Sequence, residues 1–190
     1  SRELLLALKE LVLELKLVFH EENKGYGAAL RSGFKTATKE LVFYTDGDAQ
    51  YDVRELPLLL QKLTSDTDIV NGYKIQRSDP PHRIIIGYIY QHAIRWIFWL
   101  PIKDPDCDFR LIRRKVFDKV NLESSTGTIT IELVKKIQQA GFRFAEVGVH
   151  HYFRIYGQSQ FFNFKRVLKT LWKLVFLWFR LMVFRSNPRR

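Results

Sequence analysis

Acidic residues are absent from the last part of this chain. Residues 147–190 contain no Asp or Glu, yet they hold nine of the 31 Lys and Arg residues. The remaining 22 basic residues lie in residues 1–146 with all 20 acidic ones, so the formal net charge of +11 comes mainly from the C-terminal segment. A basic segment behind a nearly neutral body predicts contact with a local anionic surface, either a membrane or a nucleic acid.

Cysteine is also scarce. Cys107 is the single cysteine, which excludes an intrachain disulfide and favours a reducing, cytosolic compartment. The chain does not begin with Met and has no charged-then-apolar leader, so we expect no secretory signal. Its 190 residues, 46% of them apolar, are enough for one packed domain.

Apolar spacing predicts alternating helices and strands. Asp52 and Glu55 predict a capping box at the start of one helix, and Gly141 marks the end of another. This alternation predicts an α/β domain in which helices cover both faces of a mostly parallel sheet. We expect helices over residues 2–13, 26–38, 53–63, 84–102 and 130–141, a helical turn over 114–120, and strands over 15–20, 41–45, 68–75, 108–114 and 142–149.

The segment 84–102 is apolar enough to resemble a membrane span. Gln91, His92 and Arg95 lie at its centre, and an Arg at mid-bilayer costs about 2.5–3.5 kcal/mol. We therefore expect a buried or membrane-facing helix.

Asp46 and Asp48 follow the apolar strand "LVFYT" directly. Ligands of open α/β sheets bind beyond the carboxyl ends of strands, and two carboxylates one residue apart suit a divalent cation that also holds a diphosphate. Gly47 leaves room for such a ligand, and Gln50 offers a neutral oxygen. The alternative is that the two acids only shape a turn and cap a helix.

Five motifs stand in an order and spacing that resembles the family-2 inverting glycosyltransferases of the GT-A fold, especially the branch of dolichyl-phosphate mannose synthase and the bacterial polyprenyl-phosphate sugar transferases. They are "NKGYGAALRSGF", "VFYTDGDAQYD", "NGYKIQRSDPPHR", "KDPDCDFRLIRR" and "VGVHHYFRIYGQS". The resemblance covers residues 1–160. The family's two opening strands, which bind the base and ribose, have no counterpart here, so we expect a partial GT-A domain that binds nucleotide poorly.

The resemblance implies a donor site on several loops. Asp46 and Asp48 would bind Mg²⁺ or Mn²⁺ and the donor diphosphate, with Gln50 as a third residue on the metal side. Lys24 and Gly25 would flank the donor, although the glycines of this loop equally suit tight helix–sheet packing.

Cations after the next strand are implied to contact phosphates. Lys74 and Arg77 would contact the donor and Arg83 the acceptor phosphate, and Arg suits this role because its planar fork binds phosphate through two hydrogen bonds. A solvated surface role is the alternative for each.

Asp104 is implied to lie near the reacting centre as a general base, beside Arg110. A phosphate acceptor, with a second pKa near 6, is already an anion and needs little base assistance. With such an acceptor, Asp104 would instead orient Arg110 or a metal-bound water. For Asp106 and Asp108 we expect turn positions before the strand.

The loop after the last strand is implied to close over the diphosphate. Arg154 would clamp the diphosphate, Ser159 would contact the acceptor phosphate, and Gly157 would let the loop move. His150 and His151 are adjacent on a strand and point to opposite faces, so we expect structural roles rather than a shared metal site.

The basic segment predicts a helix from residue 161 to 184. At about 100° per residue its five cations occupy roughly one quarter of the circumference, and the rest is apolar, including Trp172. This pattern predicts a helix in the membrane interface over 161–185, as part of a unit 161–190 separate from a domain 1–160. The alternative is a helix docked on the domain or in a partner's groove. Nucleic acid is disfavoured because no face interleaves aromatic and basic residues. The cations are Lys165, Arg166, Lys169, Lys173 and Arg180.

These features together favour an inverting glycosyltransferase at the cytoplasmic face of a membrane. It would move a hexose from a nucleotide-diphosphate sugar to a polyprenyl phosphate. Alternatives are a sugar-hydroxyl acceptor, a catalytically impaired membrane scaffold, and a haloacid-dehalogenase-type phosphatase. The last needs a Thr or Val soon after its Asp pair, which "DGDAQYD" lacks.

Overall fold

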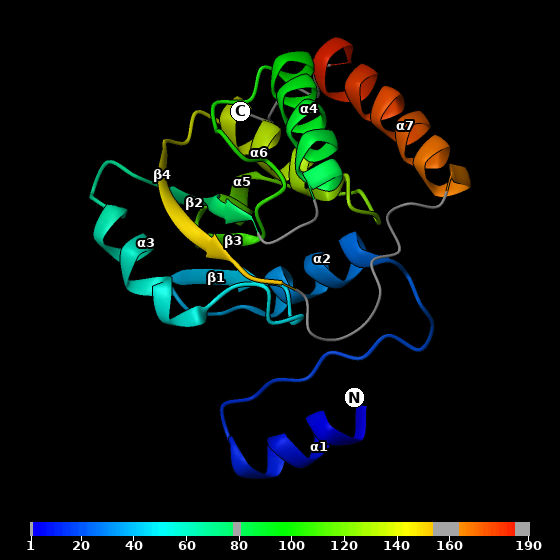
Figure 1. Cartoon of the computed structure of the whole chain (residues 1–190). Helices are drawn as coiled ribbons and strands as arrows, with labels where there is room; N and C mark the ends of the chain where they lie inside the picture. Colours follow the sequence, from blue (N-terminus) through cyan, green and yellow to red (C-terminus); the bar gives the residue numbers. More distant parts are fainter. Residues whose placement is uncertain (1, 78–80, 154–163, 185–190) are drawn as a thin grey trace.

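The computed structural model describes residues 2–77, 81–153 and 164–184, with backbone alone for 76, 77, 81–83 and 164–168. Four strands form one sheet in the order β1-β3-β2-β4 (Figure 1). They are β1 (Leu41–Thr45), β2 (Ile69–Arg77), β3 (Phe109–Arg113) and β4 (Phe144–His151).

The sheet is mixed, not mostly parallel as expected. β2 and β4 are parallel, whereas β3 runs antiparallel to both β1 and β2. The reason is that the chain leaves β2 and returns as β3 at the same edge of the sheet. The carboxyl ends of β1, β2 and β4 therefore share one edge with the amino end of β3.

Helices cover both faces of the sheet, as the α/β pattern predicts. On one face, α3 (Leu56–Lys62) inserts Leu59 against Val70 and Leu111. On the other face, α2 (Tyr26–Thr36) and α6 (Ile129–Gln139) pack on the sheet with the short α5 (Val116–Lys119). Most apolar side chains of both faces are buried or partly buried, so the sheet forms the centre of the core.

The predicted capping box is wrong. Asp52 caps a short 3-10 turn, Val53–Glu55, by accepting a hydrogen bond from the backbone N–H of Arg54 at 2.9 Å. Glu55 does not reach back to Asp52, because its Oε2 accepts from the backbone N–H of His150 at 2.9 Å. Gly141 does follow the end of α6, with φ of +79°.

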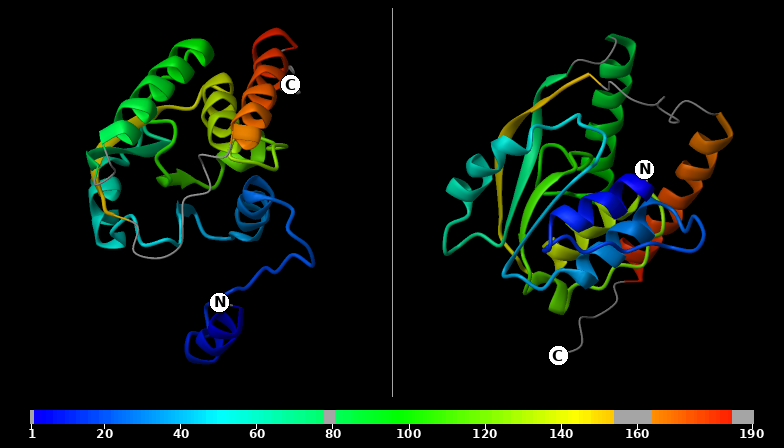
Figure 2. Two further views of the ribbon diagram at one scale, coloured as in Figure 1. Left: turned by 45° about the vertical axis from the view of Figure 1, so that its right-hand side comes forward. Right: turned by 90° about the horizontal axis from the view of Figure 1, so that it is seen from below.

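The predicted strand over 15–20 is also wrong. α1 (Arg2–Leu11) stands apart from the sheet, and the chain from 12 to 25 is irregular (Figures 1 and 2). A strand needs a neighbour for its backbone hydrogen bonds, and none of β1 to β4 pairs with this segment. The remaining predicted helices and strands are present among the described residues, with their ends shifted by a few residues.

The C-terminal helix is docked on the domain. α7 (Phe164–Trp178) continues as a π-helical turn, Phe179–Val183, and lies near α4 (Pro81–Phe98) with the C-terminal ends of the two helices adjacent (Figure 1). The indole Nε1 of Trp178 donates to the carbonyl of Ile97 at 3.1 Å. Their common core contains Ile94, Phe98, Leu174, Leu177 and Leu181.

The docking of this helix changes the expected orientation of Arg180, one of its five cations. Arg180 turns toward the domain, where its guanidinium pairs with Glu123 at 2.6 Å and Glu132 at 2.8 Å. Across the described part of the chain, no helix has both the length and the hydropathy to cross a bilayer.

Candidate active site

The predicted metal pair lies in a tight turn after β1. The Oδ1 of Asp48 accepts from the backbone N–H of Gln50 at 3.1 Å, and Ala49 has a left-handed φ of +61°. The Oδ1 of Asp46 accepts from the hydroxyl of Tyr26, at the start of α2, at 2.9 Å. Both carboxylates are thus held by the protein at the carboxyl edge of the sheet.

A third carboxylate lies beside this pair. The antiparallel register pairs Thr45 with Phe109, so the next two residues, Asp46 and Asp108, stand opposite each other. Asp108 accepts from the hydroxyl of Tyr44 at 3.4 Å. Burial raises the pKa of Asp108 to about 7, with Asp46 adding to the rise. A cation between the two acids would relieve this repulsion.

The acids fit a metal ion that arrives with phosphate. Among the described residues, no group of three or more His, Cys, Asp or Glu side chains is arranged to hold a metal by itself. Mg²⁺ and Mn²⁺ prefer oxygen ligands, and Mg²⁺ typically takes one or two carboxylates with the remaining positions filled by water or phosphate. Asp46 and Asp48 supply that number of ligands.

Arg110 shapes the loop before β3. Its side chain is fully buried, its Nε donates to the carbonyl of Cys107 at 3.0 Å, and its Nη2 donates to the carbonyl of Pro105. The guanidinium carbon lies 5.9 Å from the ring centre of Tyr44. Arg110 therefore fixes the backbone that carries Asp104 and Asp108, and its donors point to carbonyl groups of the protein.

Lys74 and Asp104, predicted in separate roles, form one buried pair. The Nζ of Lys74 lies 3.3 Å from the Oδ2 of Asp104, with 6% and 5% of the two side chains exposed. Lys74 also donates to the carbonyl of Asp106 at 2.9 Å. Asp104 accepts from the backbone N–H of Asp106 at 3.2 Å, so the pair ties β2 to the loop before β3.

Gln50 links the turn of residues 46–50, called here the metal turn after its predicted role, to the end of β4. Its Nε2 donates to the carbonyl of Tyr152 at 3.1 Å, and the backbone N–H of Tyr152 donates to the Gln50 carbonyl at 2.8 Å. His150 and His151 contact different parts of the protein, as expected for adjacent residues of a strand. His150 pairs with Glu55, whereas the ring of His151 lies 5.2 Å from that of Tyr51.

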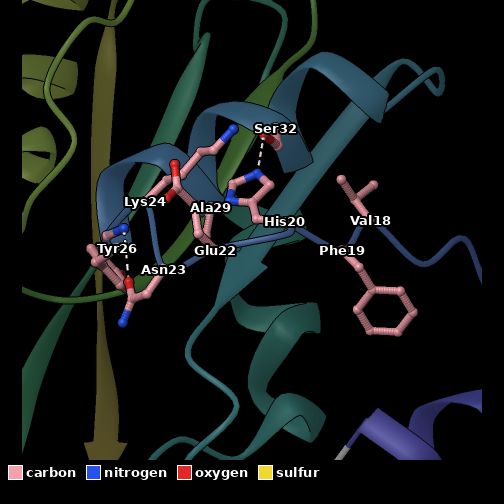
Figure 3. Close-up of a pocket in the computed structure, with 10 residues that line it drawn as sticks. Val18, Phe19, His20, Glu22, Asn23, Lys24, Tyr26, Ala29 and Ser32 are labelled. Atoms are coloured by element: carbon pink, nitrogen blue, oxygen red, sulfur yellow. Dashed lines mark hydrogen bonds between the residues drawn. The ribbon is translucent and has the colours of Figure 1, made fainter.

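Lys24 and Gly25 line a cleft of about 390 Å³ between the loop before α2 and α2 itself (Figure 3). Lys24 is exposed, and Gly25 has φ of +91°, a conformation that favours glycine. Tyr26 also lines the cleft, and its hydroxyl binds Asp46, so this residue connects the cleft to the metal turn.

A model of the family described as "Glycosyl transferase family 2" matches residues 1–120, more than half of the chain. The chain belongs to glycosyl transferase family 2. The dodecaprenyl-phosphate galacturonate synthase of Rhizobium johnstonii is 25% identical over 178 residues, which cover 93% of this chain and 52% of that protein. The chain thus spans about half the length of this curated relative.

Solved structures share the GT-A fold with this family 2 chain. Glucosyl-3-phosphoglycerate synthase from Mycobacterium tuberculosis in complex with UDP matches 90% of this chain and 58% of its own, at a TM-score of 0.59 and 12% identity. The same synthase with Mn²⁺, UDP and glucosyl-3-phosphoglycerate matches 96% and 60%, at a TM-score of 0.57 and 13% identity. These likenesses establish the α/β GT-A class predicted from the sequence.

The roles of all the predicted site residues in this family 2 chain stay predictions, and for four of them the side chain is not described. Arg154 and Ser159 lie outside the described residues. Of Arg77, in β2 opposite His151, and Arg83, in the first turn of α4, the backbone alone is described.

Sequence reasoning missed three residues of the site, Tyr26, Tyr44 and Asp108. The two tyrosine hydroxyls hold the carboxylates, and Asp108 was expected only to shape a turn. An antiparallel β3 would have revealed Asp108, because the residue before such a strand faces the residue after β1. Nothing in the spacing of the "NKGYG" loop indicates that Tyr26 reaches Asp46.

Proposed function

We propose that this family 2 glycosyltransferase transfers a hexose or hexuronate from a nucleotide-diphosphate sugar to a polyprenyl phosphate. The observation that carries the proposal is the convergence of Asp46, Asp48 and Asp108 at one edge of a GT-A sheet. The named activity of the Rhizobium relative supports the lipid acceptor, and the UDP and Mn²⁺ complexes of the M. tuberculosis synthase support the donor and the metal.

Asp46 and Asp48 would hold Mg²⁺ or Mn²⁺, with Gln50 fixing their turn against Tyr152. When bound, the metal would neutralise the departing diphosphate. Lys24 and Gly25 would contact the donor from the cleft side.

Cations from the other loops complete the proposed phosphate contacts. Arg77 and Arg154 would add positive charge at the diphosphate, and Arg83 and Ser159 would contact the acceptor phosphate. Lys74, predicted as a donor contact, would act by holding Asp104 and the loop before β3.

The buried Lys74–Asp104 pair supports a phosphate acceptor. A general base for a sugar hydroxyl needs a carboxylate that reaches the substrate proton, whereas the Asp104 carboxylate accepts from Lys74 and from the N–H of Asp106. A phosphate monoester has ionised at neutral pH and attacks without such a base. Asp104 and Arg110 would then act by holding the loop before β3 in place at the reacting centre.

A membrane surface is the proposed location of the acceptor. Large apolar side chains are exposed along the outer faces of α4 and α7, and Lys169 is exposed nearby on α7. Exposed aromatic and aliphatic residues beside cations suit the anionic, cytoplasmic leaflet. They include Ile85, Tyr88, Ile89 and Trp96 on α4 and Leu171, Trp172, Val175 and Phe176 on α7.

The test is a transfer assay with polyprenyl phosphate in anionic vesicles, Mn²⁺, and a donor panel that includes UDP-glucose and UDP-galacturonate. We expect a lipid-linked sugar product that Asp48→Asn abolishes and that Asp66→Asn, at an exposed ion pair with Arg143, leaves unchanged. Transfer only to a sugar hydroxyl would refute the lipid acceptor. Vesicle binding without any transfer would favour a scaffold.

A further inference from the structure

Arg180 lies in the π-helical turn that continues α7 and pairs with a buried carboxylate of α6. Its Nη2 donates to the Oε1 of Glu132 at 2.8 Å, and its Nη1 donates to the Oε2 of Glu123 at 2.6 Å. The Glu132 side chain is fully buried, whereas that of Glu123 is half exposed. A buried carboxylate is tolerated only when it is paired, so the position of Arg180 and that of Glu132 depend on each other.

Glu132 also fixes the backbone of residues 123–125, called here the bridging segment. Its Oε1 accepts from the N–H of Glu123 at 3.1 Å, and its Oε2 accepts from the N–H of Ser124 at 2.8 Å. Lys136 completes the pairing at 2.7 Å. One carboxylate thus holds α7 on one side and the bridging segment on the other.

The bridging segment touches the start of α2 without intervening side chains. The N–H of Gly27 donates to the carbonyl of Ser125 at 3.0 Å. A Cβ atom at Gly25 would lie 2.3 Å from that same oxygen, and one at Gly27 would lie 2.5 Å from the carbonyl oxygen of Ser124. Contact this close transmits a shift of the bridging segment directly to the α2 N-terminus.

Tyr26 lies between these two glycines and reaches the metal turn. Its hydroxyl donates to the Oδ1 of Asp46 at 2.9 Å. Burial raises the pKa of Tyr26, which keeps the hydroxyl protonated as a donor. These contacts therefore run without a break from α7 to the first carboxylate of the Asp-x-Asp motif.

We propose that Tyr26 and Arg180 are positioning residues that couple the docking of α7 to the placement of Asp46. The inference rests on the proposed function for its catalytic meaning, since α7 would be the lipid-facing helix and Asp46 a ligand of the donor metal. A change in how α7 is docked then alters metal affinity through the bridging segment.

The test compares Tyr26→Phe, Arg180→Gln and the double variant of the full chain. The first readout is amide hydrogen exchange over residues 46–50, which needs no metal. The second is Mn²⁺ affinity in the presence of UDP, by electron paramagnetic resonance. Controls are Arg143→Gln, at an exposed ion pair, and Tyr88→Phe, at an exposed tyrosine. Arg180→Lys, which keeps the charge but loses the forked geometry, replaces Arg180→Gln if that variant unfolds.

We expect both single variants to accelerate exchange over 46–50 and to weaken Mn²⁺ binding about three- to tenfold, the scale of one lost hydrogen bond. The double variant should match Tyr26→Phe alone, because both changes break the same path. Unchanged exchange in the Arg180 variant, or additive effects, would overturn the coupling. Coupled exchange in a chain that binds no Mn²⁺ would instead refute the proposed donor site.

Discussion

Asp46 and Asp108 stand opposite each other across β1 and β3, one residue beyond the last registered pair, Thr45 and Phe109. The two acids belong to motifs more than 60 residues apart. Facing carboxylates repel unless a proton or a cation separates them, so their placement marks this edge of the sheet as a site for positive charge.

The pH dependence of stability should show this repulsion. The pKa of Asp108 is raised to about 7, from an ordinary value of 3.8, by burial and by Asp46. The stabilising contribution of the protonated acid is complete below pH 3.8 and is lost as the pH rises through about 7. Asp108→Asn should therefore raise the melting temperature, relative to the unmodified chain, more at pH 8 than at pH 5.

Thermal unfolding in metal-free buffer at the two pH values measures this difference. Asp118→Asn, at an exposed ion pair with Arg114, is the control and should give the same small shift at both. Equal shifts for Asp108→Asn at pH 5 and pH 8 would mean that the protonation state of the acid does not change between these pH values, which would contradict a pKa near 7.

Replacing one partner of the buried Lys74–Asp104 pair should lower the free energy of unfolding more than replacing both partners. Lys74→Met leaves the Asp104 carboxylate buried without its partner cation, and we expect a loss of about 3–5 kcal/mol in the free energy of unfolding. The double variant Lys74→Met with Asp104→Leu should lose less than Lys74→Met alone. Urea denaturation measures both, and a larger loss in the double variant would contradict the pairing.

Two glycines of α2 should respond in opposite directions to alanine. Gly27→Ala places a Cβ against the Ser124 carbonyl and should lower the free energy of unfolding by about 1–3 kcal/mol. Gly33→Ala, on the same helix with no atom within 4 Å of the added carbon, should raise it by up to about 1 kcal/mol. Similar effects at the two positions would remove the evidence for close contact with the bridging segment.

Binding to anionic vesicles should depend on the exposed aromatics of both α4 and α7. Trp96→Ala and Trp172→Ala, at side chains 84% and 75% exposed, should each reduce flotation with vesicles that contain phosphatidylserine. Leu60→Ala, on the exposed side of α3, is the control and should bind as the unmodified chain does. Equal binding by all three variants would place the membrane contact elsewhere.

The sequence predicts the α/β class, nearly all helices and strands, and the location of Asp46 and Asp48 after a buried strand. These follow from apolar periodicity, which is a local property. The direction of β3 is not local, since it depends on where α4 returns the chain, and so the Asp46–Asp108 pairing was missed.

The pairing of side chains could not be predicted from the sequence either. Lys74 and Asp104 are 30 residues apart. Lys74 was predicted to contact the donor and Asp104 to act as a general base or to orient Arg110, so their mutual pairing was not expected. The five cations of the C-terminal helix predicted a helix in the membrane interface, with the cations toward anionic headgroups. Arg180 instead turns inward, because Glu132 is buried within its reach.

The central claim is that Asp46 and Asp48 bind a divalent cation together with a nucleoside diphosphate. Titration of Mn²⁺ into the chain by electron paramagnetic resonance, with and without UDP, tests it most directly when repeated on Asp48→Asn. The account predicts that UDP tightens Mn²⁺ binding to the unmodified chain and that the substitution removes this effect. Mn²⁺ binding that is the same in both chains and indifferent to UDP would contradict it.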